Sequence, residues 1–212
     1  MDDFDRSVFI NCPFDGDYAE ILQAILFCVT VMGFRPRLAT ERSDSGETRL
    51  EKIRELIEGS RWSIHDLSRC QARAAGEMFR LNMPFELGID WGCRRYFGQG
   101  RDAKRFLILE EQRYRFQAAL SDISGCDIES HDGNHRKALV RVRNWLRQEA
   151  GARADGPERL LGQYEDFLGW HYEHKLAQGH AEKDIRDYPT FELLEAMGRW
   201  MEAGKPKDFR GA

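Results

Sequence analysis

The stretch SVFINCPFDG (residues 7–16) decides the fold of this chain. Its first half is apolar and β-prone, and its second half contains the turn formers Pro and Gly, which is typical of a buried strand that runs into a loop. Residues 18–33 follow with apolar side chains at helical spacing and end at Gly33, a residue suited to a helix C-terminus. A buried strand followed by an amphipathic helix is the repeating unit of an α/β protein.

The same alternation continues through the first 150 residues. Further strands are expected at residues 34–39, 62–67, 105–109 and 127–130, and further helices at residues 49–57, about 82–96, 114–120 and 135–148. Strands that alternate with helices in this way require parallel pairing. The sequence therefore predicts a flavodoxin-like five-stranded parallel sheet with helices on both faces.

The composition changes after residue 150. The segment AGARADG (residues 150–156) is small and polar, as in a linker, and two helices rich in aromatic residues are expected at 160–176 and 188–201. About 60 residues are few for an independent core. We therefore divide the chain into an α/β domain (residues 1–150) and a C-terminal helical extension (residues 151–212) that packs on this domain or on a partner.

The overall composition excludes several classes of protein. A net charge of −4 and a pI near 5.9 argue against nucleic acid as a partner, and no apolar run is long enough to span a membrane. Five scattered cysteines without a CxxC pair indicate reduced thiols in the cytoplasm. The six histidines form only loose pairs, so no metal is expected.

The segment NMPFELGIDW (residues 82–91) carries the candidate catalytic group. Pro84 suits the first turn of a helix that begins at Asn82, and Glu86 is expected in that first turn. The residues expected to face the core are Phe85, Leu87 and Ile89. Two readings of Glu86 stay open. Its carboxylate either lies at the lip of a cavity or only satisfies the helix dipole and the free backbone N–H groups.

Three polar loops are expected at the same edge of the sheet as Glu86. They comprise residues 11–17, 40–48 and 66–82, and the last of them leads into the Glu86 helix. In open parallel sheets, ligands bind beyond the carboxyl ends of the strands. These loops and Glu86 therefore define the candidate site.

The order of these segments resembles that of a TIR domain of the divergent bacterial kind. The resemblance rests on VFIN (residues 8–11), on FEL (residues 85–87) and on a middle pattern, and it covers roughly residues 5–148. The middle pattern comprises Ile53, Ile57, Ser60, Ile64, Leu67 and Ser68. The C-terminal helices lie outside the resemblance.

The resemblance implies an activity and a site. Catalytic TIR domains cleave the nicotinamide–ribose bond of NAD, so NAD is the implied substrate and no separate cofactor is implied. The essential glutamate of the family maps onto Glu86, and its substrate-covering loop maps onto about residues 40–46. Bacterial relatives of this kind often act in antiphage defence and are commonly silent until assembled, which implies a homo-oligomer.

Seven further residues are candidates for substrate binding, each with a structural alternative. Asn11 and Ser68 would hydrogen-bond ribose or phosphate, or else cap turns, and Asp66 would orient a ribose hydroxyl or close a turn. The others are Phe14 and Trp91 for stacking on the base or nicotinamide, Arg42 for the diphosphate, and Asp15 in the turn after the first strand.

Two other functions stay open at this point. A non-catalytic TIR-like module would bind a nucleotide and oligomerise, with the C-terminal helices as the partner surface. An enzyme similar to nucleoside deoxyribosyltransferases would use a glutamate as nucleophile on the sugar and act without NAD.

Overall fold

One parallel sheet forms the centre of the protein. The computed structural model describes residues 3–70, 72, 75–76, 81–186 and 188–208. Its strands are β1 (Ser7–Asn11), β2 (Arg35–Arg37), β3 (Trp62–Asp66), β4 (Arg105–Glu110) and β5 (Glu129–Ser130). They lie in the order β2-β1-β3-β4-β5, and every neighbouring pair is parallel. The predicted flavodoxin-like five-stranded parallel sheet is confirmed.

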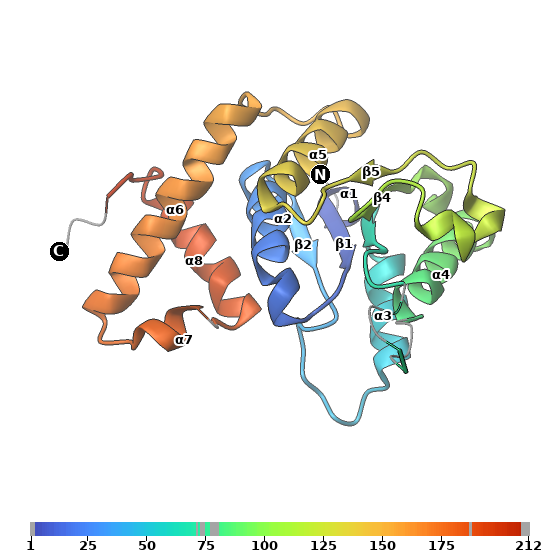
Figure 1. Ribbon diagram of the computed structural model, residues 1–212, viewed down its shortest axis with the longest axis horizontal. Coiled ribbons are helices and arrows are strands. Elements are labelled where there is room, and N and C mark those ends of the chain that lie inside the picture. Colours follow the sequence, from blue (N-terminus) through green and yellow to red (C-terminus); the bar gives the residue numbers. More distant parts are fainter. Residues whose placement is uncertain (1–2, 71, 73–74, 77–80, 187, 209–212) are drawn as a thin grey trace.

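Helices cover both faces of this sheet (Figure 1). Along the chain they are α1 (Asp3–Arg6), α2 (Ala19–Val31), α3 (Arg49–Glu58), α4 (Asn82–Tyr96), α5 (His135–Glu149), α6 (Pro157–Ala177), α7 (Glu182–Arg186) and α8 (Thr190–Glu202). One face packs against α2 and α5, and the other against α3 and α4. Because both faces are covered, β1 and β3 are buried along their whole length.

Some expected elements differ from those observed. The second strand is shorter than 34–39, because it is an edge strand and Pro36 has no N–H to donate. The fifth strand lacks residues 127–128. The helix expected at 114–120 is wrong: Tyr114 has a positive φ of 67°, which a right-handed helix does not allow, and two 3-10 turns follow (Phe116–Ala118 and Ser121–Ile123).

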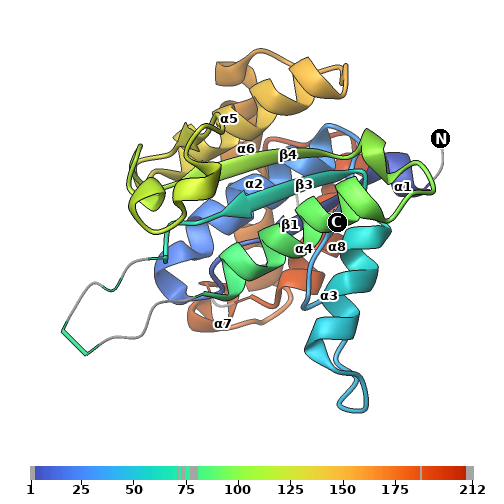
Figure 2. The same ribbon diagram turned by 90° about the vertical axis from the view of Figure 1, so that its right-hand side faces the viewer.

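The C-terminal helices pack on α2 (Figures 1 and 2). The ring of Phe27 on α2 lies 5.1 Å from that of Tyr164, 5.6 Å from that of Phe167 and 5.7 Å from that of Trp200. All four side chains belong to the same hydrophobic cluster as the sheet residues beneath α2. The extension therefore adds a further helical layer to the core of the α/β domain.

None of the helices within the described residues is long and apolar enough to cross a membrane. The longest of them, α6, has 21 residues but carries charged side chains along its length.

Replacing Trp200 tests how much this helical layer stabilises the protein. Trp200 is fully buried against Phe27 and Phe167, so Trp200→Ala should lower the free energy of unfolding by about 3–5 kcal/mol. Urea denaturation measures this loss. Phe191→Ala on the same helix is the control, because that side chain is 55% exposed and its removal should cost no more than about 0.5 kcal/mol. Equal losses in the two variants would contradict this account.

Candidate active site

Glu86 lies on the inner face of α4, at the end of the sheet where the strands finish (Figure 2 shows where α4 begins). The buried residues of the helix recur every three or four positions, and they are Met83, Glu86, Leu87, Asp90 and Cys93. The helix begins at Asn82, so Glu86 is its fifth residue. The prediction that Glu86 lies in the first turn is therefore wrong. Phe85 was expected in the core but is 58% exposed.

A buried ion pair explains why α4 presents this face. Asp90 is fully buried and lies 3.1 Å from Lys104 Nζ and 3.0 Å from His65 Nε2. Lys104 also donates to the backbone carbonyls of Ile57 and Ser60. Burial alone would raise the pKa of Asp90, but the hydrogen bond from His65 and the charge of Lys104 hold this pKa below its ordinary value. These polar contacts hold Asp90 toward the sheet, on the same face of the helix as the buried Met83, Leu87 and Cys93.

Asn11 holds the start of the same helix. Its side-chain amide donates to Nδ1 of His65 at 3.0 Å and to the backbone carbonyl of Met83 at 2.9 Å. Because Nδ1 of His65 accepts, the ring proton lies on Nε2, which donates to Asp90. Asn11 was predicted to contact substrate. Instead, both hydrogens of its side-chain amide bond to protein groups, so Asn11 holds the start of α4 in position.

The Glu86 carboxyl stands in contrast to Asp90. It is 6% exposed, and among the residues that the structure describes none forms a hydrogen bond or ion pair with it. Burial raises its pKa from 4.5 to about 7, partly offset by the charge of Arg49. Glu86 is therefore a proton-exchanging group close to neutral pH.

Two neighbours of Glu86 were not predicted from the sequence. Arg49 is the first residue of α3 and follows Thr48, the N-cap of that helix, so its position was predictable but its proximity to Glu86 was not. Cys12 follows β1 and is buried. Burial first, and then the charges of Asp66, Glu86 and Asp15, raise the pKa of the Cys12 thiol, which therefore stays protonated and is a poor nucleophile.

Asp66 and Ser68 belong to a second buried network. Asp66 accepts hydrogen bonds from Tyr18 Oη at 2.6 Å, from the backbone N–H of Ser68 at 2.9 Å and from His131 Nε2 at 3.0 Å. Gly133 donates its N–H to His131 Nδ1, so the His131 proton lies on Nε2, and Ser68 Oγ is 3.1 Å from that same nitrogen. Since Asp66 and Ser68 share one nitrogen, these groups are not a Ser-His-Asp triad.

The ionisation of Asp66 follows from these bonds. Burial would raise its pKa, but the hydrogen bonds from His131, Ser68 and Tyr18 keep the pKa below its ordinary value. A fully buried carboxylate with three donors ties the ends of β3 and β5 to the turn after β1. The predicted contacts of Asp66 and Ser68 with ribose would have to break this network.

Phe14 and Asp15 lie in the turn after β1, near the end of the sheet where Glu86 lies. Phe14 is 41% exposed, so its ring is accessible for stacking. Asp15 accepts from the backbone N–H of Tyr18 at 3.1 Å and lies 3.2 Å from Arg69. Arg69 is thus a further cation at this end of the sheet that the sequence did not single out.

Arg42 lies in the polar loop before α3, and its guanidinium pairs with Glu47 and Glu55. A diphosphate would compete with these two carboxylates for Arg42. The polar loop expected at residues 66–82 includes residues 71, 73–74 and 77–80, which lie outside the described residues.

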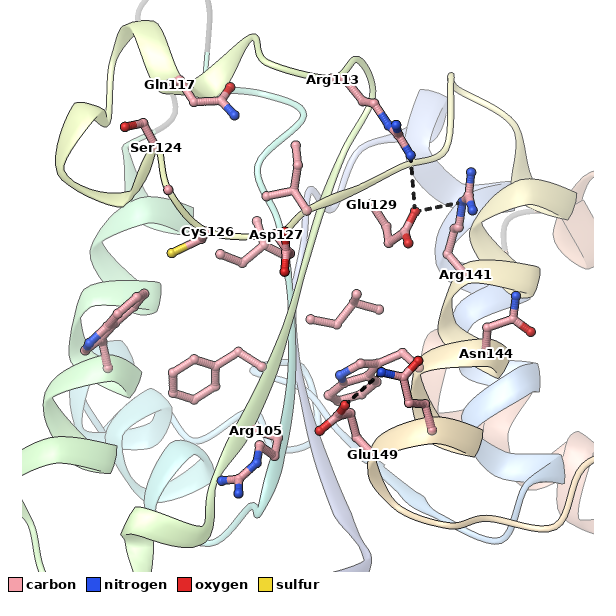
Figure 3. A pocket seen from close by; sticks show the side chains of 18 of the residues that line it. Arg105, Arg113, Gln117, Ser124, Cys126, Asp127, Glu129, Arg141, Asn144 and Glu149 are labelled. Atoms are coloured by element: carbon pink, nitrogen blue, oxygen red, sulfur yellow. Dashed lines mark hydrogen bonds and ion pairs between the residues drawn. The ribbon is translucent and has the colours of Figure 1, made fainter.

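Trp91 does not join the Glu86 group. Five helical residues correspond to a rotation of about 500°, so Trp91 points about 140° away from Glu86 around the helix axis. Its ring lies 6.1 Å from that of Phe106 and lines a cavity of about 790 Å³ along β4 (Figure 3). Of the predicted site residues, only Trp91 lines this cavity.

Comparison with protein-family models, with curated proteins and with solved structures finds no match to this chain. The functional argument therefore rests on the residues and their geometry. Among the described residues, no group of three or more histidines, cysteines or carboxylates is arranged to hold a metal ion.

Removing the charge of Lys104 tests the anchoring of α4. Lys104→Met leaves Asp90 buried without its cation and should lower the free energy of unfolding by about 3–5 kcal/mol, measured by urea denaturation. The double variant Lys104→Met/Asp90→Asn should recover most of this loss, because the uncompensated charge is gone. Arg35→Ala breaks an exposed ion pair with Asp3 and should cost less than about 1 kcal/mol. A double variant no more stable than Lys104→Met would refute the electrostatic explanation.

Replacing Glu86 tests its raised pKa. The unfolded chain ionises this group near pH 4.5 and the folded protein near pH 7, so stability is lost as the pH rises through this interval. Glu86→Gln should therefore be more stable than wild type by about 1–3 kcal/mol at pH 8, and the difference should vanish at pH 4. Thermal and urea unfolding at both pH values measure this. Glu165→Gln, at an exposed ion pair on α6, should show no such dependence.

Proposed function

We propose that this protein is a TIR-like NAD glycohydrolase that cleaves the nicotinamide–ribose bond, with Glu86 as its catalytic carboxylate. The observation that carries the proposal is the state of Glu86: a buried carboxyl without a described partner, at the end of a parallel sheet where ligands bind. The resemblance of the sequence to TIR domains supports the same residue.

The chemistry needs one carboxylate near the anomeric carbon. Cleavage of the N-glycosidic bond passes through a sugar cation, which an ionised Glu86 stabilises directly or captures as a covalent intermediate. Nicotinamide leaves as a neutral molecule, so no strong general acid is required. Water then adds to the sugar and completes the hydrolysis, as in glycosidases that use a carboxylate in this way.

Other residues supply binding in this proposal. The positive charge of Arg49 lowers the pKa of Glu86, which shows that the two side chains interact. The position of Arg49 at the start of α3 suits an anionic diphosphate. Phe14 offers an exposed ring for stacking on the base or nicotinamide. Asn11 and Asp66 act indirectly, by holding α4 and the strand ends in place.

The cellular part of the proposal rests on the resemblance alone. A cytoplasmic enzyme of this class would assemble into a homo-oligomer and deplete NAD as an antiphage response.

Incubation of the purified protein with NAD, followed by chromatography, tests the activity. Wild type at high concentration should release nicotinamide, and Glu86→Gln should reduce the rate at least about 100-fold, as expected for loss of the group that stabilises the transition state. The wild-type rate should rise with pH to a plateau, with a midpoint near pH 7, because the ionised form of Glu86 is the active one. Glu165→Gln is the control and should keep wild-type activity.

Two outcomes would contradict the proposal. Equal nicotinamide release by wild type and Glu86→Gln would remove Glu86 from the mechanism. Base exchange on deoxynucleosides by wild type, without NAD cleavage, would instead assign the protein to deoxyribosyltransferase-like chemistry at the same carboxylate.

A further inference from the structure

The sheet ends unevenly at its β5 edge. β4 has six residues, but β5 has two, which pair with Leu109 and Glu110. The first four residues of β4, from Arg105 to Ile108, therefore have no described strand on their outer side. An unpaired stretch of strand is a template for pairing with another chain.

The backbone of this stretch has hydrogen-bonding groups that face outward. The N–H of Arg105 donates to the carbonyl of Arg61 at 3.0 Å, on the β3 side. In a strand, successive residues turn their backbone groups to opposite sides. Phe106 and Ile108 therefore direct theirs away from β3, toward the open edge.

The open edge forms the floor of the cavity of about 790 Å³ (Figure 3). Trp91 and Arg94 on α4 form one wall, and Asn144, Trp145 and Gln148 on α5 form the opposite wall. The segment before β5, which includes Cys126 and Asp127, lies across one end. The unpaired strand thus lies at the floor of a groove between two helices, and an extended chain is the ligand that can pair with its backbone as a further strand.

The two walls offer apolar contacts to alternate side chains of such a strand. On the α4 side, the rings of Trp91 and Phe106 lie 6.1 Å apart. On the α5 side, Leu107 lies in the core cluster against which Trp145 packs. An added strand points successive side chains to opposite sides, which matches these two apolar surfaces.

The charges of the groove differ between its two ends. Arg94 lies over the Phe106 ring at 5.4 Å, and Arg105 donates to backbone carbonyls only, so neither has a carboxylate partner among the described residues. At the other end, Glu129 lies 3.1 Å from Arg141 and 3.9 Å from Arg113 (Figure 3). Two arginines without a described carboxylate partner therefore lie where β4 begins, and the carboxylate of Glu149 on α5 lines the cavity at the same end (Figure 3).

We propose that this groove binds an extended peptide segment of a partner protein, which adds to the sheet as a strand beside β4. The segment carries apolar side chains at alternate positions and a carboxylate at the end that meets Arg94 and Arg105. Backbone hydrogen bonds to Phe106 and Ile108 supply affinity, and the two apolar surfaces and the arginines supply selectivity. This site is independent of the chemistry at Glu86.

A displayed library of random eight-residue peptides, selected on the full-length protein, tests the site. Wild type should enrich peptides with alternating apolar residues and an acidic residue at one end. Phe106→Pro removes the ring and the outward backbone N–H, and it leaves the hydrogen bonds between β3 and β4 intact because the Phe106 N–H does not point toward β3. Its affinity for the enriched peptides should be about tenfold lower than that of Phe106→Ala, the matched control for loss of the ring.

Two further measurements use the folded wild type and a charge variant. Enriched peptides should lose binding when N-methylated along the edge that faces β4 and keep it when methylated along the other edge. This comparison decides the question if Phe106→Pro does not fold. Arg94→Glu with Arg105→Glu should remove the preference for an acidic residue.

Three outcomes would overturn the proposal. These are the absence of any enriched peptide family, equal affinity of the peptides for Phe106→Pro and Phe106→Ala, and a concentration-dependent wild-type dimer that Phe106→Pro abolishes. The last would assign the groove to a second copy of this chain instead of a partner peptide.

Discussion

The buried contact between Asp90 and Lys104 is the interaction on which the rest of the structure depends. Both charges are out of contact with solvent, and a buried charge is costly unless its partner is held in place. Lys104 is held by two carbonyls at the end of α3 and beyond it, and Asp90 is held by His65 in the centre of the sheet. One residue of α4 is thereby connected to a strand, a second helix and the loop before β4.

The same arrangement determines the environment of Glu86. Asp90 is one helical turn from Glu86 on the same face, so fixing Asp90 inward turns Glu86 inward as well. The buried acids differ in their partners. Asp66 has three hydrogen-bond donors, Asp90 has a lysine and a histidine, and Glu110 has Arg115, whereas Glu86 has no described partner. A carboxylate kept inside without compensation destabilises the folded state, and such sites are typical of function.

The sequence was sufficient to predict most of the fold but little of this site. The strand SVFIN was predicted from its local apolar pattern and is observed. The same holds for the termination of the following helix at Gly33, whose φ is 86°. On α4, Leu87 is buried and Ile89 packs on a core cluster, as expected, but Phe85 is exposed. Asp90 is buried by its contacts with Lys104 and His65, and Glu86 lies on the same face of the helix. Trp91 was grouped with Glu86 by proximity in sequence, although helical rotation separates them. The contacts of Asp90 with His65 and Lys104 join segments far apart in the chain, so a local sequence pattern cannot reveal them.

The packing of α6 and α8 on α2 has a consequence for how the chain folds. Phe27 belongs to the α/β unit by sequence, but its ring contacts Tyr164, Phe167 and Trp200, which all come from residues beyond 156. Folding of α2 onto the sheet and docking of the last helices are therefore coupled steps. A nascent chain that has emerged only as far as the linker still exposes the face of α2 that carries Phe27, and α6 and α8 cover this face once they have emerged. The core of the first 150 residues is therefore fully covered only when α6 and α8 pack on α2.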